Sequence, residues 1–257
     1  MKELDSIFNT LWKKYSSVNT QAEAIHSLLG NVENDHIALR TFDSYLVGLK
    51  VFSKIFTDLG YEEKGEYKFD TKNLTAKHYE KEGYPKVFIS QLNLGELSIG
   101  FNNIVSKCLL DFSRNPLTLK DFLLSGNLPW SPISYEEYNI LKEESEYGAW
   151  LCTFGFVANH FTVSVNKLKE FDNLSILNLY LKNHGFILNS SGGEIKGSKE
   201  EGLMQSSTMA SKVKVNFSDG EYEIPCCYYE FAERFGFEGF IAGSADKIFE
   251  STDNKNG

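Results

Sequence analysis

Two histidines at matching positions of two similar segments are the residues of this chain best suited to chemistry. Residues 34–42 alternate apolar and polar side chains with the period of a β-strand, and residues 158–165 repeat that pattern. His36 lies near the beginning of the first segment, and His160 lies near the beginning of the second. Imidazole is a common metal ligand. The repeat indicates an internal duplication, and we expect a metal site between the two copies.

A third ligand is expected from the last strand of the second copy, which would lie beside its first strand in a barrel. Glu230 stands there inside a run of aromatic residues, and a buried carboxylate must be paired or bind a metal. Glu233 is the alternative, but it falls past the expected strand end, where solvent or Arg234 would satisfy it. The predicted metal ligands are therefore His36, His160 and Glu230.

Two histidines and one carboxylate leave coordination positions open for a substrate. This ligand set is typical of non-haem Fe(II) oxygenases, and a hydrolytic zinc site is an alternative. Arg40 shares a strand face with His36 about 13 Å further along, where its guanidinium group could hold a substrate carboxylate. In the competing interpretation the histidines are hydrogen-bonded structural residues and Arg40 pairs with Asp35 or Asp43.

A polar stretch at residues 205–208 lies inside another expected strand. It either lines the cleft or forms an ordinary polar face, and we keep both interpretations. If it lines the cleft, it supplies candidate substrate contacts from Gln205, Ser207 and Thr208. The remaining histidines are expected on helix faces or at the surface: His26, His78 and His184.

The elements that must position these residues follow one order twice. Each copy consists of a strand, then a helix that ends in a glycine followed by an aromatic residue, and then further strands. This order indicates an α+β fold of paired βαβββ modules forming an open barrel. A helical insertion separates the modules, and the tail after Phe240 is expected to be frayed. The predicted helices span residues 3–29 (two helices), 44–59, 99–112, 117–124, 135–150 and 174–182, and the predicted strands span 34–42, 62–81 (a hairpin), 86–92, 158–165, 204–210, 212–217 and 222–231.

Composition narrows the class of protein. The 257 residues include 35 acidic and 26 basic side chains, a net charge of −9 that disfavours a general nucleic-acid binder. No apolar run is as long as a membrane span, and the acidic, amphipathic start does not resemble a secretory signal. The four cysteines fit no zinc or disulfide spacing, so we expect reduced thiols in a cytoplasmic protein.

Several motifs together resemble the 2-oxoadipate dioxygenase/decarboxylase family, over about residues 30–240. The matching motifs are Asp35-His36-Ile37-Ala38-Leu39-Arg40-Thr41-Phe42, Val87-Phe88-Ile89-Ser90-Gln91-Leu92, Ser145-Glu146-Tyr147 with Trp150, Asn159-His160-Phe161-Thr162, Gln205-Ser206-Ser207-Thr208 and Tyr229-Glu230-Phe231. The resemblance implies a short member of the vicinal oxygen chelate superfamily. It further implies one domain over residues 1–257, with modules at 30–95 and 151–240 and the helical insertion at 96–150.

The resemblance also implies an activity. Family members use Fe(II) and O2 to convert 2-oxoadipate to 2-hydroxyglutarate and CO2 in lysine breakdown. The family's iron ligands fall on His36, His160 and Glu230, and its substrate-binding arginine falls on Arg40. The expected partners are thus a 2-oxo acid and O2, with Fe(II) as the cofactor and zinc or another divalent metal as its substitute in a purified sample. A metal-dependent hydrolase and a non-catalytic small-molecule binding module are the alternatives.

Overall fold

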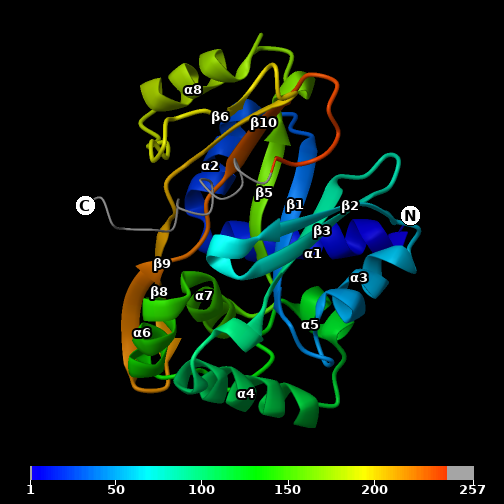
Figure 1. Ribbon diagram of the computed structural model, residues 1–257. Helices are drawn as coiled ribbons and strands as arrows, with labels where there is room; N and C mark the ends of the chain where they lie inside the picture. The colour runs from blue at the N-terminus through cyan, green and yellow to red at the C-terminus, as the bar shows by residue number, and fades with distance from the viewer. Residues whose placement is uncertain (1, 242–257) are drawn as a thin grey trace.

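The structure is a computed structural model that describes residues 2–241. Its centre is one sheet of eight strands that curls into an open half-barrel, with β1 and β5 side by side in the middle (Figure 1). The strand order is β2-β3-β4-β1-β5-β10-β7-β6, and β8 pairs with β9 in a separate hairpin. The strand bounds are β1 Asn34–Phe42, β2 Glu62–Phe69, β3 Leu74–Glu80, β4 Lys86–Leu92, β5 Ala158–Ser164, β6 Lys196–Ser198, β7 Leu203–Ser207, β8 Lys212–Phe217, β9 Gly220–Pro225 and β10 Glu230–Arg234.

Eight α-helices of the described chain surround this sheet. The predicted helical insertion is confirmed as α4 to α7, which lie together at the bottom of Figure 1, while α8 lies at the top. The helix bounds are α1 Lys2–Val18, α2 Thr20–Leu29, α3 Leu49–Thr57, α4 Ile99–Arg114, α5 Leu119–Ser125, α6 Tyr135–Glu144, α7 Glu146–Phe154 and α8 Leu174–Asn183. None of the helices among the described residues is long and apolar enough to cross a membrane.

The predicted duplication is confirmed by the order of the elements and by their pairing. The first module is β1-α3-β2-β3-β4, and the second is β5-α8-β6-β7-β10. In each module the first strand pairs in parallel with the last, and β1 and β5 join the two modules as antiparallel neighbours. A glycine with positive φ follows each helix, Gly60 after α3 and Gly185 after α8, with φ of 88° and 86°. This left-handed conformation is one that glycine adopts at little cost.

Two predicted elements have different boundaries in the structure. The helix predicted at residues 44–59 begins only at Leu49, because Gly48 folds back in a turn whose N–H donates to Ser44 O at 2.6 Å. The side chain of Gln91 then accepts a hydrogen bond from Leu49 N at 2.9 Å at the start of the helix. The helix predicted at residues 135–150 is two helices, because Ser145 ends α6 and its side chain caps α7.

The end of the second module also differs from the prediction. The strand predicted at residues 222–231 is broken at residues 226–229, so β9 belongs to the separate hairpin and only β10 enters the main sheet. The strand predicted at residues 204–210 ends at Ser207, and the short strand β6 was not predicted. The expectation of a frayed tail concerns mainly residues 242–257, which lie outside the described residues.

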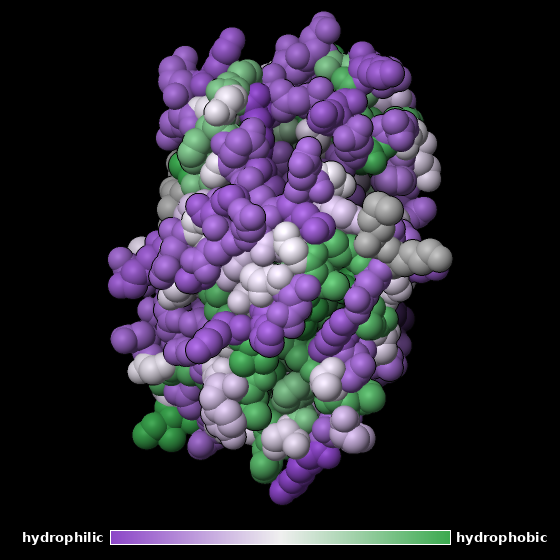
Figure 2. Space-filling model, turned by 90° about the vertical axis from the view of Figure 1, so that its right-hand side faces the viewer, coloured by the Kyte–Doolittle hydropathy of each residue, from purple (hydrophilic) through white to green (hydrophobic). Residues whose placement is uncertain are grey.

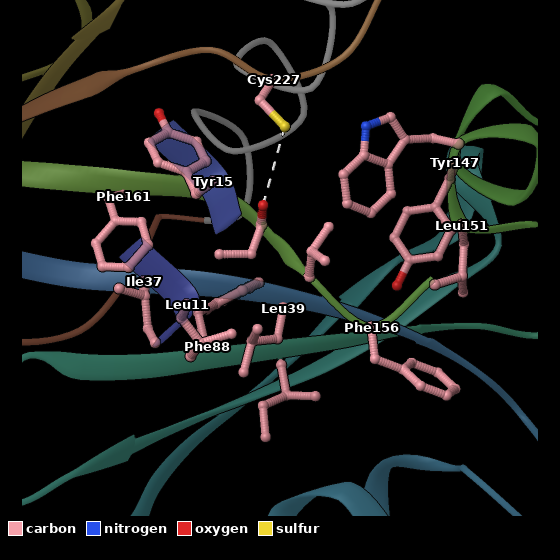
Figure 3. Close-up of a cluster of buried hydrophobic side chains, with 14 of the residues drawn as sticks. Leu11, Tyr15, Ile37, Leu39, Phe88, Tyr147, Leu151, Phe156, Phe161 and Cys227 are labelled. Carbon is pink, nitrogen blue, oxygen red and sulfur yellow. Dashed lines mark hydrogen bonds between the residues drawn. The ribbon is translucent and has the colours of Figure 1, made fainter. Parts of the chain in front are cut away.

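A large part of the core lies on the face of the sheet opposite the histidines. Ile37, Leu39 and Phe161 pack there against Leu11 and Tyr15 of α1 (Figure 3). Fully burying side chains of this size contributes about 1.5–3 kcal/mol each. The four cysteines are free and buried, as predicted. The face shown in Figure 2 is mostly hydrophilic around a smaller apolar area.

Candidate metal centre

Three neighbouring strands bring the predicted ligands together. β1 carries His36, β5 carries His160 and β10 carries Glu230, and these strands lie in the order β1-β5-β10 at the middle of the sheet. Each residue offers one ligand atom, and these atoms all lie within 4.8 Å of one another. All three residues are buried. The structure thus forms a compact cluster of two imidazoles and one carboxylate from three distant parts of the chain.

The strand register shows that Glu230 and Phe88 occupy equivalent positions in the two modules. Glu230 pairs with the residue two positions after His160, in the parallel pair of β10 and β5. Phe88 pairs with the residue two positions after His36, in the parallel pair of β4 and β1. Three of the four equivalent positions therefore carry a side chain able to bind a metal, and the fourth carries an apolar ring.

An extra residue stands immediately before each histidine. The register between β1 and β5 shifts at Asp35 in β1 and at Asn159 in β5, so each of these residues forms a β-bulge. Asp35 Oδ1 lies 2.8 Å from His36 Nδ1, and Asn159 Oδ1 lies 3.1 Å from His160 Nδ1. An acceptor at Nδ1 favours the neutral tautomer whose Nε2 has a free lone pair, which is the form that binds a metal. The two bulges therefore orient both rings toward the centre of the cluster.

The buried carboxylate of Glu230 is well satisfied. Its Oε1 accepts hydrogen bonds from Gln205 Nε2 at 2.6 Å and from Thr162 Oγ1 at 3.2 Å. His36 Nε2 lies 3.3 Å from Oε1, and His160 Nε2 lies 3.7 Å from Oε2. Burial alone would raise the pKa of this carboxyl, but the electrostatic interaction with the His160 imidazole and the hydrogen bond from His36 lower it. Glu230 is therefore held in the ionised form that a metal ligand requires.

The two imidazoles differ in protonation because only one has two acidic neighbours. Burial lowers the pKa of His160 to about 3, against the opposing charge of Glu230. Burial alone would also lower the pKa of His36, but the hydrogen bonds with Asp35 and Glu230 raise it above its usual value. His160 is therefore neutral near pH 7, whereas His36 would release a proton when it binds a metal.

Arg40 lies on the face of β1 that carries His36, as predicted. The guanidinium carbon of Arg40 lies 4.7 Å from the ring centre of Tyr147 and 4.9 Å from that of Trp150, both on α7. The Tyr147 hydroxyl accepts a hydrogen bond from Thr41 N at 3.0 Å, and Trp150 Nε1 donates to Cys226 O at 2.7 Å. Burial lowers the pKa of Arg40, although a guanidinium group keeps its charge in proteins. The helical insertion thus holds a buried cation at the sheet face.

One cavity contains both the cluster and the arginine. It is partly open to solvent and comprises about 450 Å³ of space free of protein atoms, and His36, His160, Glu230 and Arg40 all line it. Apolar rings from Phe88 and Phe240, together with Gln205 and Tyr228, form further parts of its wall. A cavity with a ligand cluster and a separate cation is suited to a small anionic ligand.

Only part of the polar stretch at residues 205–208 lines the cavity, and the rest does not. Gln205 lines the cavity and binds Glu230, whereas neither Ser207 nor Thr208 is among the described residues that line it. Thr208 Oγ1 accepts a hydrogen bond from Tyr229 N at 3.0 Å. Contact of Gln205, Ser207 and Thr208 with a substrate stays a prediction.

Two expectations about residues outside the predicted ligand set are wrong. Glu233 is neither solvated nor paired with Arg234, because it is buried and its Oε2 accepts a hydrogen bond from Leu174 N at 2.8 Å at the start of α8. His78 is not at the surface but buried on β3, where its Nδ1 lies 2.9 Å from the Tyr67 hydroxyl.

Arg234 has a role that sequence reasoning missed. Its Nε and Nη2 donate to the two oxygens of Asp35 at 2.6 and 2.8 Å, and its Nη1 donates to the backbone oxygens of Phe237 and Gly239. These bonds place the ring of Phe240 4.7 Å from that of His36. Arg234 therefore links the residue that orients His36 to the segment that covers it.

The donor set fits a divalent metal. Two imidazole nitrogens and one carboxylate oxygen converge, each histidine has a partner at Nδ1, and Oε1 of Glu230 has two hydrogen-bond donors. Such outer partners are typical of protein metal sites. The geometry supports a metal cofactor bound through His36, His160 and Glu230.

Comparison with known proteins places the chain among characterised enzymes. The family model described as 2-oxoadipate dioxygenase/decarboxylase matches residues 3–115 and 106–237. The chain is 34% identical over 293 aligned residues to the plastid 2-oxoadipate dioxygenase/decarboxylase of Oryza sativa. This alignment covers 98% of the chain and 80% of the rice protein.

Solved structures of similar proteins agree with this family assignment. The hydroxyglutarate synthase of Oryza sativa in complex with 2-oxoadipate superposes with a TM-score of 0.91 at 32% identity, over 98% of this chain and 93% of that one. A Shewanella frigidimarina protein, provisionally described as a hydrolase, superposes with a TM-score of 0.83 at 44% identity, over 93% and 97% of the two chains. These matches confirm the predicted α+β fold of paired modules.

Proposed function

The chain belongs to the 2-oxoadipate dioxygenase/decarboxylase family, and we propose that it uses Fe(II) and O2 to convert 2-oxoadipate to 2-hydroxyglutarate and CO2. The observation that carries this proposal is the single cavity with a two-histidine, one-carboxylate cluster at one place and a buried arginine at another. The equation balances, because the six carbons and seven oxygens of the acid and O2 reappear in the two products.

In this proposal His36, His160 and Glu230 would hold the metal at the wall of the cavity that they line. Bound Fe(II) would supply the capacity to activate O2 at its open coordination positions, which is the known use of such a ligand set. The ligands themselves come from adjacent strands rather than loops, so their spacing is fixed by sheet hydrogen bonds.

Arg40 would orient the substrate. Four residues of extended strand separate it from His36, about 13 Å between Cα atoms. An acid with a carboxylate at each end could therefore place its 2-oxo acid end at the cluster and its distal carboxylate at the guanidinium fork. Because Tyr147 and Trp150 flank the guanidinium, the cation is fixed in place before the substrate arrives.

Apolar rings would keep water from the reacting end. Phe240 lies 4.9 Å from Phe88 by ring centres, and both border the cavity close to His36. A site of low polarity strengthens the attraction between Arg40 and an anion. We further propose that both modules and the insertion act as one domain, in the cytoplasm, with the 2-oxo acid and O2 as the small-molecule partners.

The test is oxygen uptake by the Fe(II)-loaded protein after addition of 2-oxoadipate, with CO2 and 2-hydroxyglutarate measured in the same sample. We expect one CO2 per O2 consumed. Uptake that is absent while iron stays bound at one equivalent would contradict this activity. Turnover without oxygen would instead support a hydrolase, and binding without turnover would support a non-catalytic module.

Variants separate the proposed roles. His36→Ala, His160→Ala and Glu230→Ala should each lose bound iron, whereas Arg40→Ala should keep it and raise the KM for 2-oxoadipate at least about tenfold. Full iron occupancy in Glu230→Ala would show that the third ligand is another residue.

A further inference from the structure

Two adjacent tyrosines precede Glu230 and face opposite sides of the chain. Tyr228 lines the cavity. Tyr229 packs on the other side, with its ring centre 5.8 Å from Trp12 and 6.2 Å from Tyr15. Both side chains are fully buried, and neither hydroxyl has a hydrogen-bond partner among residues 2–241. The chain thus offers a buried donor inside the cavity and a matched one outside it.

The Tyr228 ring is held in a fixed position. It stacks on the ring of His160 with centres 4.7 Å apart and planes 26° apart. The backbone oxygen of Tyr228 accepts a hydrogen bond from the Tyr15 hydroxyl at 2.5 Å. The stack restrains the ring and the hydrogen bond restrains the backbone of Tyr228, and a side chain held by its surroundings suits recognition of a ligand.

Tyr228 lines the same cavity as two charged side chains, Glu230 and Arg40. Burial raises the pKa of Tyr228, the charge of Glu230 raises it further and that of Arg40 lowers it. The phenol is therefore a neutral donor at physiological pH. Arg40 offers no acceptor, because a guanidinium group only donates. Oε1 of Glu230 already accepts hydrogen bonds from Gln205 and Thr162, and Tyr228 makes no hydrogen bond to either oxygen of this carboxylate.

A buried hydroxyl without an acceptor costs free energy, and a ligand oxygen would remove that cost. An anionic oxygen is favoured, since Arg40 in the wall of the same cavity is a cation. We propose that Tyr228 is a specificity-determining residue whose hydroxyl donates a hydrogen bond to the distal carboxylate of the 2-oxo dicarboxylic acid, beside Arg40. This inference rests on the proposed function and names a recognition element for the same substrate.

The consequence is selection between dicarboxylic and monocarboxylic 2-oxo acids. A hydrogen bond to a charged group is worth about tenfold to a hundredfold in affinity. Tyr228→Phe removes one oxygen and keeps the ring that stacks on His160. This variant should therefore weaken binding of 2-oxoadipate by that factor and leave binding of 2-oxohexanoate, which has no distal carboxylate, unchanged.

The experiment measures Kd by anaerobic titration calorimetry, and KM and kcat in air, with Fe(II)-loaded wild type, Tyr228→Phe and Tyr229→Phe. We expect Tyr228→Phe to raise Kd and KM for 2-oxoadipate with iron content unchanged. Tyr229→Phe, which loses an equally buried hydroxyl outside the cavity, should match the wild type. In a double-mutant cycle, Arg40→Ala and Tyr228→Phe should together cost less than the sum of their separate effects.

Two outcomes would overturn the inference alone. Wild-type Kd and KM in Tyr228→Phe would show that the hydroxyl does not contact the substrate. An equal loss with 2-oxohexanoate would show that it acts at the metal end. If wild-type protein with bound iron neither binds nor converts 2-oxoadipate, the proposed function fails, and this inference fails with it.

Discussion

Substitution of Asp35 by Asn tests whether the buried ion pair behind His36 stabilises the fold. Asp35 and Arg234 make two hydrogen bonds, at 2.6 and 2.8 Å, and their side chains are only 6% and 8% exposed. Asn removes the negative charge and leaves the guanidinium group buried without its counter-charge. Breaking one side of such a pair costs about 3–5 kcal/mol. That is a large part of the total stability of about 5–15 kcal/mol expected for a protein.

The assay is equilibrium unfolding of the metal-free protein in urea, with Asp58→Asn as the control. Asp58 pairs with Lys54 at 2.6 Å, the same distance as the shorter Asp35–Arg234 bond, but both control side chains are more than half exposed. An exposed pair of this kind contributes at most about 1 kcal/mol. We therefore expect a clearly lower urea midpoint for Asp35→Asn and almost none of that change for Asp58→Asn. Equal losses in the two variants would refute the argument from burial.

Measurements of iron affinity in Asp35 variants separate two effects of Asp35, the orientation of the His36 ring and the negative charge. Asparagine can still accept the hydrogen bond from His36 Nδ1, as Asn159 does for His160. Asp35→Ala cannot, and loss of such an outer partner weakens metal binding about 10–100-fold. We expect Asp35→Asn to retain most of the iron affinity that Asp35→Ala loses. The same affinity in both variants would mean that this hydrogen bond does not orient the ligand.

Two further predictions follow from protonation and from helix capping. Iron binding should weaken as pH falls through the pKa of His36, which lies above its usual value of 6.5, because the proton must leave before the metal binds. The pKa of His160 is about 3, so protonation of His160 opposes metal binding only in strong acid. Iron occupancy measured from pH 8 to pH 5 checks this, and Asp35→Asn should shift the midpoint to lower pH. Glu233→Ala should cost about 1–3 kcal/mol in urea unfolding, because it leaves Leu174 N buried without its acceptor, yet iron content should not change. Lost iron in that variant would reopen Glu233 as a ligand.

Much of this architecture could be predicted from the sequence because it is encoded in local periodicity. The alternation at residues 34–42 and 158–165 correctly gave two equivalent strands. The glycine–aromatic endings at Gly60 and Gly185 correctly marked equivalent helices. Glu230 was singled out by its apolar surroundings, and the structure does place it beside both histidines. Each of these signals depends only on neighbouring residues.

Features that depend on distant contacts could not be predicted in this way. The β-bulges at Asp35 and Asn159 exist only relative to a partner strand, although the Asp–His and Asn–His dipeptides were visible. The break at residues 226–229 looked like continuous strand, because buried apolar residues have no period when both sides are covered. The ion pair between Asp35 and Arg234 joins residues 199 positions apart. These features depend on tertiary contacts and not on the local secondary-structure propensity of the residues.

The duplication also explains why the candidate site is open on one side. Two equivalent modules would offer four equivalent positions around a shared centre, at His36, His160, Glu230 and Phe88. Four ligands would leave a metal fewer open positions, as in closed structural sites. A phenylalanine at the fourth position removes a ligand without adding charge, and its ring borders the cavity that also contains Arg40. The open side of a bound metal would therefore face the first module, where the substrate is expected. In this way the difference between the two modules at one position would leave room for a substrate beside a bound metal.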